Sequence, residues 1–389
     1  MLFCSYKNDF EENLNPVKKQ YYLYLLIATV TAVLLAGKIQ YTLPQFEEID
    51  LFKYREMALA APGVNMEIPH PYVYRIFAPW LAGILPFDLD TSFYVLNLLF
   101  LFGLSYVIFE FILLFGLEYK TAFFATVAFL FNRYFFQFLA FDYFQLSDTL
   151  SYFLFVLSFI LLTKRQYFRF GLSVAIGVLT REVALLIIPI GFAYLYENKW
   201  GKEDYIKFLA VSAIAALLFL AVRMFIQIES DENYLTQIEY GLVNFFNPRA
   251  FLKRFIIAFT PFSVLPFLFY KELIKLLREN KYLIVWIVFA VASSLFGNDY
   301  ERLMMPTAPV FFLFLALLIE KYFISYKNGF IQKVLLFLVI ILSLVGSLYH
   351  LWGVFRLANP EISLISTIIL DILILLIFGY LKIFRERTA

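Results

Sequence analysis

The chain of 389 residues is 62% hydrophobic and 21% aromatic, with 16% charged residues and a mean hydropathy of +0.78. A soluble domain of this length cannot hide so much apolar surface, so the composition predicts a polytopic membrane protein. A formal net charge of +2 gives no reason to expect a nucleic-acid partner. One cysteine excludes an internal disulfide, and two histidines offer few ligands for a dedicated metal site.

Apolar runs recur along the whole chain in windows of about 19 residues. They occur at 21–37, 92–116, 121–141, 147–163, 168–197, 206–228, 255–270, 282–297, 304–320, 333–352 and 363–381. The run 168–197 is much longer than the roughly 20 residues that one span needs, and Thr180-Arg181-Glu182 interrupts it. We therefore expect two short spans meeting near Arg181, and one all-α transmembrane domain over 1–389 with about twelve transmembrane helices.

The distribution of basic residues supports this count. Twelve spans with a cytoplasmic N-terminus put most of the 32 lysines and arginines on the cytoplasmic side, including those of loops 271–281 and 321–333. If residues 168–197 formed a single span, both loops would lie outside the cytoplasm, and the excess of basic residues downstream would be on the outer side. We expect both termini in the cytoplasm and an integral, multi-pass protein of a bacterial inner (plasma) membrane.

This topology places the polar segments of the chain on the outer side. They are the loop 38–75 with its acidic Glu47, Glu48 and Asp50, the corner 141–149, the break 180–182, the loop 229–254, and residues 297–302. An ionisable residue within the bilayer costs roughly 2.5 to 3.5 kcal/mol on insertion scales. Several of them on one face therefore indicate a functional site.

These segments carry short motifs in a fixed order. They are Asp50-Leu51-Phe52-Lys53-Tyr54, then Pro71-Tyr72-Val73-Tyr74-Arg75 with Pro79, Ser147-Asp148-Thr149, Thr180-Arg181-Glu182 with Pro189, and Asp299-Tyr300-Glu301-Arg302 with Pro306 and Pro309. These motifs, in this order and on the same side of the membrane, resemble those of the GT-C superfamily of polytopic glycosyltransferases, which use a polyprenyl-phosphate sugar. The resemblance extends over residues 21 to 310.

The resemblance implies a GT-C-like fold and an acidic residue after the first span that is essential for catalysis, for which Asp50 is the best match. It also implies a polyprenyl-phosphate sugar donor in the membrane lipid, and a glycan or lipid-linked acceptor. Some members carry a large soluble C-terminal domain, which is not apparent here. This departure from the family pattern puts recognition of a large protein acceptor in doubt.

Glycosyl transfer from a lipid phosphate explains the residue types. A carboxylate such as Asp50 makes the acceptor hydroxyl nucleophilic, and Glu48 or Asp148 stabilises the oxocarbenium-like transition state. Guanidinium groups hold the leaving phosphate. The candidate substrate-binding residues are Arg75, Arg181, Arg302, Tyr74, Tyr300, Glu301 and His70. No cofactor is implied, although a divalent metal ion is compatible with this chemistry.

Plainer interpretations remain open for the same residues. Arg75 and Arg302 are also typical of helix ends anchored at lipid headgroups, and Arg181 with Glu182 is typical of an ion pair at a helix break. Two other functions fit a twelve-span protein with buried charges. A secondary transporter or lipid-linked oligosaccharide flippase should show two related halves, which the sequence does not display. A polysaccharide polymerase would share the lipid-linked substrate chemistry.

Overall fold

The computed structural model is a bundle of helices and describes residues 16–39, 51–226, 239, 243, 246–295, 300–325, 329–348 and 360–388. No β-strand occurs in these ranges. Seven helices are long and apolar enough to cross a membrane: α1 (Pro16–Ala36), α4 (Leu89–Leu113), α7 (Leu146–Thr163), α10 (Lys202–Phe225), the extended α17 segment (Glu301–Ile324), α18 (Phe330–Ser347) and Leu364–Arg385 of α20 (Pro360–Thr388). The protein is therefore an all-helical, polytopic membrane protein.

An eighth span arises if α5 (Tyr119–Leu130) and the bent segment Arg133–Phe141 are taken together. Two shorter apolar helices, α8 (Tyr167–Thr180) and α15 (Tyr282–Ser294), fall below the length of an ordinary span. The number of helices in the described ranges that meet the usual criteria is thus seven or eight. The expected total of twelve stays a prediction.

The interrupted run 168–197 folds as a helical hairpin. After α8 the backbone of Arg181 becomes extended, with φ −165° and ψ 141°, and the chain returns through the 3-10 helix η4 (Glu182–Leu186) and α9 (Ile187–Glu197). The start of α8 and the end of α9 both lie near the start of α10. The Tyr167 hydroxyl donates to Asp204 at 2.7 Å, and the Tyr194 ring contacts Trp200. Arg181 therefore lies at the tip of the hairpin, as the sequence predicts.

A second break, within the expected span 121–141, is not anticipated by the sequence. After α5 the chain bends by 65° into a π-helical turn, η3 (Arg133–Gln137), and then into α6 (Phe138–Phe141). Buried Asn132 accepts from the amides of Tyr134 and Phe135 and donates to the Ala258 carbonyl at 2.9 Å. These bonds satisfy backbone groups that a broken helix would otherwise leave unpaired in the bilayer.

Other elements lie between or beside the long helices. They are α2 (Leu51–Leu59), η2 (Tyr72–Tyr74), α3 (Phe77–Gly83), α12 (Pro248–Phe259), α13 (Leu265–Leu268), α14 (Tyr270–Glu279), α16 (Tyr300–Leu303), η5 (Met305–Thr307), α17 proper (Ala308–Ile319) and the π-helical η6 (Glu320–Ile324). The expected span 255–270 is therefore divided between α12 and α13. The expected loop 271–281 is largely the helix α14, whose leucines recur at helical spacing.

Contacts between helix ends define a first face, which we call the basic face. There the ammonium group of Lys18 at the start of α1 lies 3.0 Å from the carboxylate of Glu110 at the end of α4. The carboxylate of Glu197 accepts from the amides of Lys281 and Tyr282. These contacts gather segments that the charge distribution assigns to the cytoplasm.

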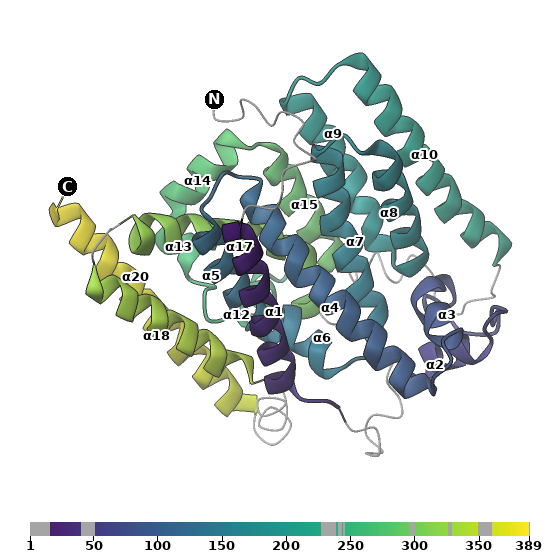
Figure 1. Cartoon of the computed structure of the whole chain (residues 1–389), viewed down its shortest axis with the longest axis horizontal. Coiled ribbons are helices and arrows are strands. Elements are labelled where there is room, and N and C mark those ends of the chain that lie inside the picture. The colour runs from purple at the N-terminus through teal and green to yellow at the C-terminus, as the bar shows by residue number, and fades with distance from the viewer. Residues whose placement is uncertain are drawn as a thin grey trace.

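The opposite ends of the helices meet on a second face, which we call the site face. The amide of Ile39 after α1 donates to the carbonyl of Phe141 before α7. Figure 1 shows α2 and α3 at this end of the bundle, beyond the start of α4, whereas α14 lies at the other end. The two faces are those that the sequence predicts to be separated by the membrane.

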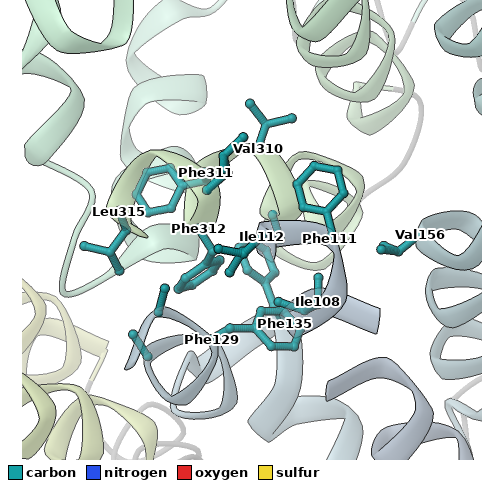
Figure 2. Close-up of a cluster of buried hydrophobic side chains, with 14 of the residues drawn as sticks. Ile108, Phe111, Ile112, Phe129, Phe135, Val156, Val310, Phe311, Phe312 and Leu315 are labelled. Atoms are coloured by element: carbon teal, nitrogen blue, oxygen red, sulfur yellow. The ribbon is translucent and has the colours of Figure 1, made fainter. Parts of the chain in front are cut away.

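The centre of the bundle is apolar and aromatic. Figure 2 shows this packing, in which Phe111 of α4, Phe129 of α5 and Phe312 of α17 are fully buried. The rings of Phe129 and Phe312 meet edge to face with centroids 5.4 Å apart. Lipid tails are as apolar as these side chains, so close van der Waals packing rather than burial from water holds such helices together. The helices α4, α5 and α17 thus form the frame for the site face.

Candidate functional site

Residues 51–88, which precede α4, form a small cap on the site face. Arg55 of α2 pairs with Asp90 of α4 at 2.8 Å, and this pair ties the cap to the bundle. Helices α2 and α3 approach closely, because a Cβ atom on Gly83 would lie 2.0 Å from the carbonyl oxygen of Ala58. The cap is therefore held in place by packing as well as by charge.

Arg75, at the end of η2, links the cap to the hairpin tip. Its Nη1 donates to the hydroxyl of buried Tyr54 at 3.1 Å, and its Nη2 lies 3.1 Å from Oε1 of Glu182. The guanidinium carbon also lies 5.7 Å from the ring centre of Tyr72. Three elements distant in sequence, α2, η2 and η4, thus meet at one arginine.

Asp148 is the centre of the second part of the cluster. It lies in the first turn of α7, is 1% exposed, and contacts the guanidinium group of Arg181 through Oδ1. Its other oxygen, Oδ2, lies 3.2 Å from Nη1 of Arg302. Arg302 also donates to Gln145, which in turn donates to Asp142 at 3.2 Å. One carboxylate therefore holds two buried arginines from different parts of the chain.

The helices position these charges favourably. Asp148 lies in the first turn of α7, where the helix dipole is positive, and Arg181 follows the C-terminus of α8, where the helix dipole is negative. The segment that carries Arg302 is anchored by Trp286, whose indole donates to the Pro306 carbonyl at 2.6 Å. The Tyr152 hydroxyl donates to the carbonyl of Arg302 itself at 3.2 Å. Two hydrogen bonds to backbone carbonyls therefore fix the segment from which the Arg302 side chain extends.

The charges of the hairpin tip and the cap affect one another. Burial works against ionisation of Glu182, but Arg75 and then Arg181 lower its pKa to about 2. Burial likewise opposes the charge of Arg75, but the carboxylate of Glu182 and the hydroxyl of Tyr54 outweigh it and raise the pKa of Arg75. Burial, followed by repulsion from Arg75 and Arg302, lowers the pKa of Arg181 to about 9. All three groups are therefore charged at neutral pH.

The sequence left open an ion pair between Arg181 and Glu182 as a plainer interpretation, and the structure gives each of the two residues another salt-bridge partner. Arg181 pairs with Asp148, and Glu182 pairs with Arg75. The extended backbone at Arg181 directs two neighbouring side chains to different partners, as alternate residues of extended chain do. The result joins four separate segments rather than closing a local pair.

The remaining candidates lie in different surroundings. Tyr74 is buried, its hydroxyl lies 3.4 Å from the Ile226 carbonyl, and the guanidinium carbon of Arg223 lies 4.6 Å from its ring centre. The ring of His70 meets that of Tyr74 edge to face at 5.1 Å. These residues form a second group at the end of α10.

Four predicted residues are less fully placed. Glu301 is buried beside Arg302 on α16. Tyr300 begins the same helix, but its side chain lies outside the described part of the chain, and so do Asp50 and Glu48 entirely. Sequence reasoning missed Tyr54, Gln145 and Tyr152 as partners of the arginines. Tyr54 ends the first motif and Gln145 lies in the polar corner 141–149, so both lie in segments that the sequence had singled out.

No metal cluster accompanies these residues. Within the described ranges, no group of three or more His, Cys, Asp or Glu side chains could hold a metal ion.

No family model, curated protein or solved structure matches the chain. A functional assignment therefore depends on the geometry of the site face.

Proposed function

We propose that the protein is a glycosyltransferase that moves a sugar from a polyprenyl-phosphate donor to a glycan or lipid-linked acceptor at the outer membrane face. The observation that carries this proposal is the convergence of Arg75, Arg181 and Arg302 on two carboxylates at the hairpin tip. Buried ionisable groups at the ends of membrane helices are costly, so their concentration in one place favours a function. The GT-C-like fold belongs to the same proposal.

The arginines divide into two roles in this proposal. The side chains of Arg75 and Arg302 are 10% and 12% exposed, so a ligand can reach them after a small movement. Their guanidinium groups bind the donor phosphate, because planar forks of donors match phosphate oxygens. Asp148 and Arg181, which are 2% and 7% exposed, hold Arg302 in position.

The transfer step needs a base and a leaving group. The oxygen of the acceptor hydroxyl attacks the anomeric carbon, the bond from that carbon to the phosphate oxygen breaks, and the lipid phosphate leaves with the electron pair. The hydroxyl proton passes to a carboxylate, which we assign to Asp50. Asp50 directly precedes α2 in the sequence, and α2 carries the Tyr54 hydroxyl that contacts Arg75. Glu48 is the second candidate in this acidic stretch.

Binding of a lipid-phosphate sugar by the purified protein tests the arginine assignment. Arg302→Ala removes a charge-assisted contact worth about 1.5 to 3 kcal/mol, so the dissociation constant should rise roughly 10- to 150-fold. Lys275→Ala, which changes an exposed cation of α14 on the basic face, is the matched control and should leave binding unchanged. Equal affinity of wild type and Arg302→Ala would favour a structural role for the arginine cluster.

The rate of sugar transfer tests the role of the Asp50 carboxylate. Asp50→Asn keeps the size of the side chain and removes its negative charge, and loss of a general base lowers rates about 100- to 10,000-fold. Glu47→Gln is the control from the same acidic stretch and should retain activity. Near-wild-type transfer by Asp50→Asn, with a donor that is shown to bind, would remove Asp50 from the mechanism.

A second candidate function is secondary transport or lipid flipping. The observation that favours it is the break between α5 and α6, because transporters use discontinuous helices to line a substrate path. Proteoliposomes loaded with a lipid-linked sugar separate the two functions. Movement of the intact lipid to the other leaflet without cleavage of the sugar–phosphate bond would support transport, whereas release of the free lipid phosphate supports transfer.

A further inference from the structure

A pocket opens on the basic face beside the first turn of α1. Its volume is about 610 Å³, and its walls come from the starts of α1 and α5, the end of α4 and the residue that follows α7. Pockets that bind small molecules generally have volumes of about 300 to 1,000 Å³. The pocket is therefore large enough for a ligand the size of a lipid headgroup, and larger than a single phosphate ion needs.

Two lysines that line this pocket pair with no acid in the described part of the chain. Lys120 in the first turn of α5 and Lys164 directly after α7 are exposed, and within the same ranges neither side chain forms a hydrogen bond. A further lysine, Lys18, is held by Glu110 at 3.0 Å, and the Tyr22 hydroxyl donates to the same carboxylate at 2.6 Å. The positive charge that a ligand can use therefore belongs to Lys120 and Lys164.

One carboxylate of the pocket lies beside these lysines. Glu118 directly precedes α5, is exposed, and does not cap that helix through its side chain. Two unpaired lysines and one unpaired acid leave the described lining of the pocket positive at neutral pH. A carboxylate accepts hydrogen bonds from hydroxyl groups. The polar part of the pocket thus fits a phosphate group that carries neighbouring hydroxyls.

The wall on the side of α4 is apolar. Leu113, Leu114 and Leu117 line it, and Val17 of α1 completes it with 48% of its surface exposed. A soluble phosphate compound gains nothing from these side chains, whereas the glycerol backbone and the first acyl carbons of a phospholipid lose contact with water against them. The combination of unpaired cations and an apolar wall therefore matches an amphiphile better than a soluble anion.

We propose that this pocket binds the headgroup of an anionic phospholipid from the leaflet at the basic face. The ammonium groups of Lys120 and Lys164 contact the phosphate, Glu118 accepts from the headgroup hydroxyls, and the leucines contact the glycerol region. Basic pockets between transmembrane helices bind anionic headgroups, and the cytoplasmic leaflet is rich in such lipids. The proposal is independent of the glycosyltransferase assignment, because the pocket and the arginine cluster lie on opposite faces.

Binding of phosphatidylglycerol to the purified full chain, measured by native mass spectrometry in detergent, tests the proposal. Each lysine near a membrane surface adds about fivefold to the affinity for anionic lipid, so Lys120→Ala combined with Lys164→Ala should raise the dissociation constant roughly 30-fold. The matched control combines Lys271→Ala with Lys275→Ala, which removes two exposed lysines of α14 on the same face and should leave the constant nearly unchanged. Equal losses in both double variants would overturn the pocket and indicate attraction to the whole face.

Two further ligands identify the source of the phosphate. Phosphatidylcholine with the same acyl chains has no net charge, so it should bind much more weakly than phosphatidylglycerol, and equal affinity would overturn the proposal. Inorganic phosphate lacks an apolar part and should not displace the lipid, whereas displacement would assign the pocket to a soluble phosphate compound.

The melting temperature separates binding from folding. Because the side chains of Lys120 and Lys164 are exposed and form no ion pair in the described ranges, their double variant should melt at the temperature of wild type. A lowered melting temperature together with weaker binding would show that the lysines support the fold, and would contradict the proposal.

Discussion

At the scale of single residues, Asp148 is the carboxylate that contacts two arginines of the site. It is 1% exposed, and its two oxygens face the guanidinium groups of Arg181 and Arg302. We therefore interpret Asp148 as the residue that positions Arg302, and Asp50 remains the candidate base.

Replacement of Asp148 by Asn should strongly destabilise the protein. The change leaves Arg181 and Arg302 buried beside each other without their shared counter-charge, and breaking such a buried pair costs roughly 3 to 5 kcal/mol. The measurement is the free energy of unfolding in mixed micelles. Asp90→Asn is the control, because its pair with Arg55 is 44% exposed on the carboxylate side and should be worth about 0 to 1 kcal/mol. Equal losses in both variants would contradict the central place of Asp148.

The ion pair between Glu182 and Arg75 predicts that the stability of the folded protein depends on pH. Its pKa is lowered to about 2 in the folded protein, below the ordinary value of 4.5. A carboxyl with a depressed folded-state pKa stabilises the fold above its unfolded pKa and loses this effect as the pH falls through the folded value. Wild type should therefore exceed Glu182→Gln in melting temperature above about pH 4.5, and the difference should shrink as the pH falls and vanish only below about pH 2. A difference that does not change with pH would exclude this pairing as its cause.

The residues of the site could be predicted better than their partners. Arg75, Asp148, Arg181 and Arg302 were all expected on one face, because polar residues in an apolar chain are conspicuous. Their pairing was not predictable, since it depends on where the extended backbone at Arg181 directs each side chain. Sequence neighbours are not spatial neighbours at such a break.

At the scale of elements, the hairpin of α8 and α9 depends on small residues at its contacts. A Cβ atom on Gly177 of α8 would lie 2.7 Å from the Cβ of Ala184 in η4, closer than side chains approach. Glycine there allows the two arms to meet next to Arg181. The close approach at this position brings Glu182 within reach of Arg75 in the cap.

Gly177→Ala should therefore separate the arms and weaken the site. Overpacking costs typically 1 to 3 kcal/mol, more than the roughly 1 kcal/mol that alanine gains over glycine in a helix. Gly379→Ala in α20, where an added Cβ meets no atom within 4 Å, is the matched control and should be neutral or stabilising. The measurement is the melting temperature together with lipid-phosphate binding. An unchanged melting temperature for Gly177→Ala would show that the hairpin can relax freely.

The sequence predicts the long apolar helices well but does not predict the break after α5. Long apolar runs predicted α4, α7, α10 and α18 to within a few residues, because a bilayer demands about 20 apolar residues per span. The break after α5 was missed, because Asn132 and Arg133 are two polar positions within an otherwise apolar window. Averaging over the window hides a bend that is set by the hydrogen bonds of one asparagine.

At the scale of the whole molecule, the arrangement of helix ends agrees with the distribution of charge. The basic face joins the start of α1, the end of α4 and the hairpin ends through contacts such as Lys18 with Glu110. The site face joins the cap and the hairpin tip through Arg75 and Glu182. Positively charged loops are retained in the cytoplasm, so the basic face should be the cytoplasmic one.

Cysteine labelling tests this orientation in intact cells. In a background that lacks Cys4, Met66→Cys in the cap should react with an impermeant maleimide, whereas Lys275→Cys on α14 should react only after the membrane is opened. Both positions are well exposed, Met66 with 53% of its surface and Lys275 with 75% of its side chain, so access to the protein itself does not limit the reaction. Labelling of both cysteines in intact cells would contradict a membrane between the two faces. Labelling at 275 alone would keep the two faces but reverse them, and it would place the arginine cluster in the cytoplasm, away from an outer-face donor.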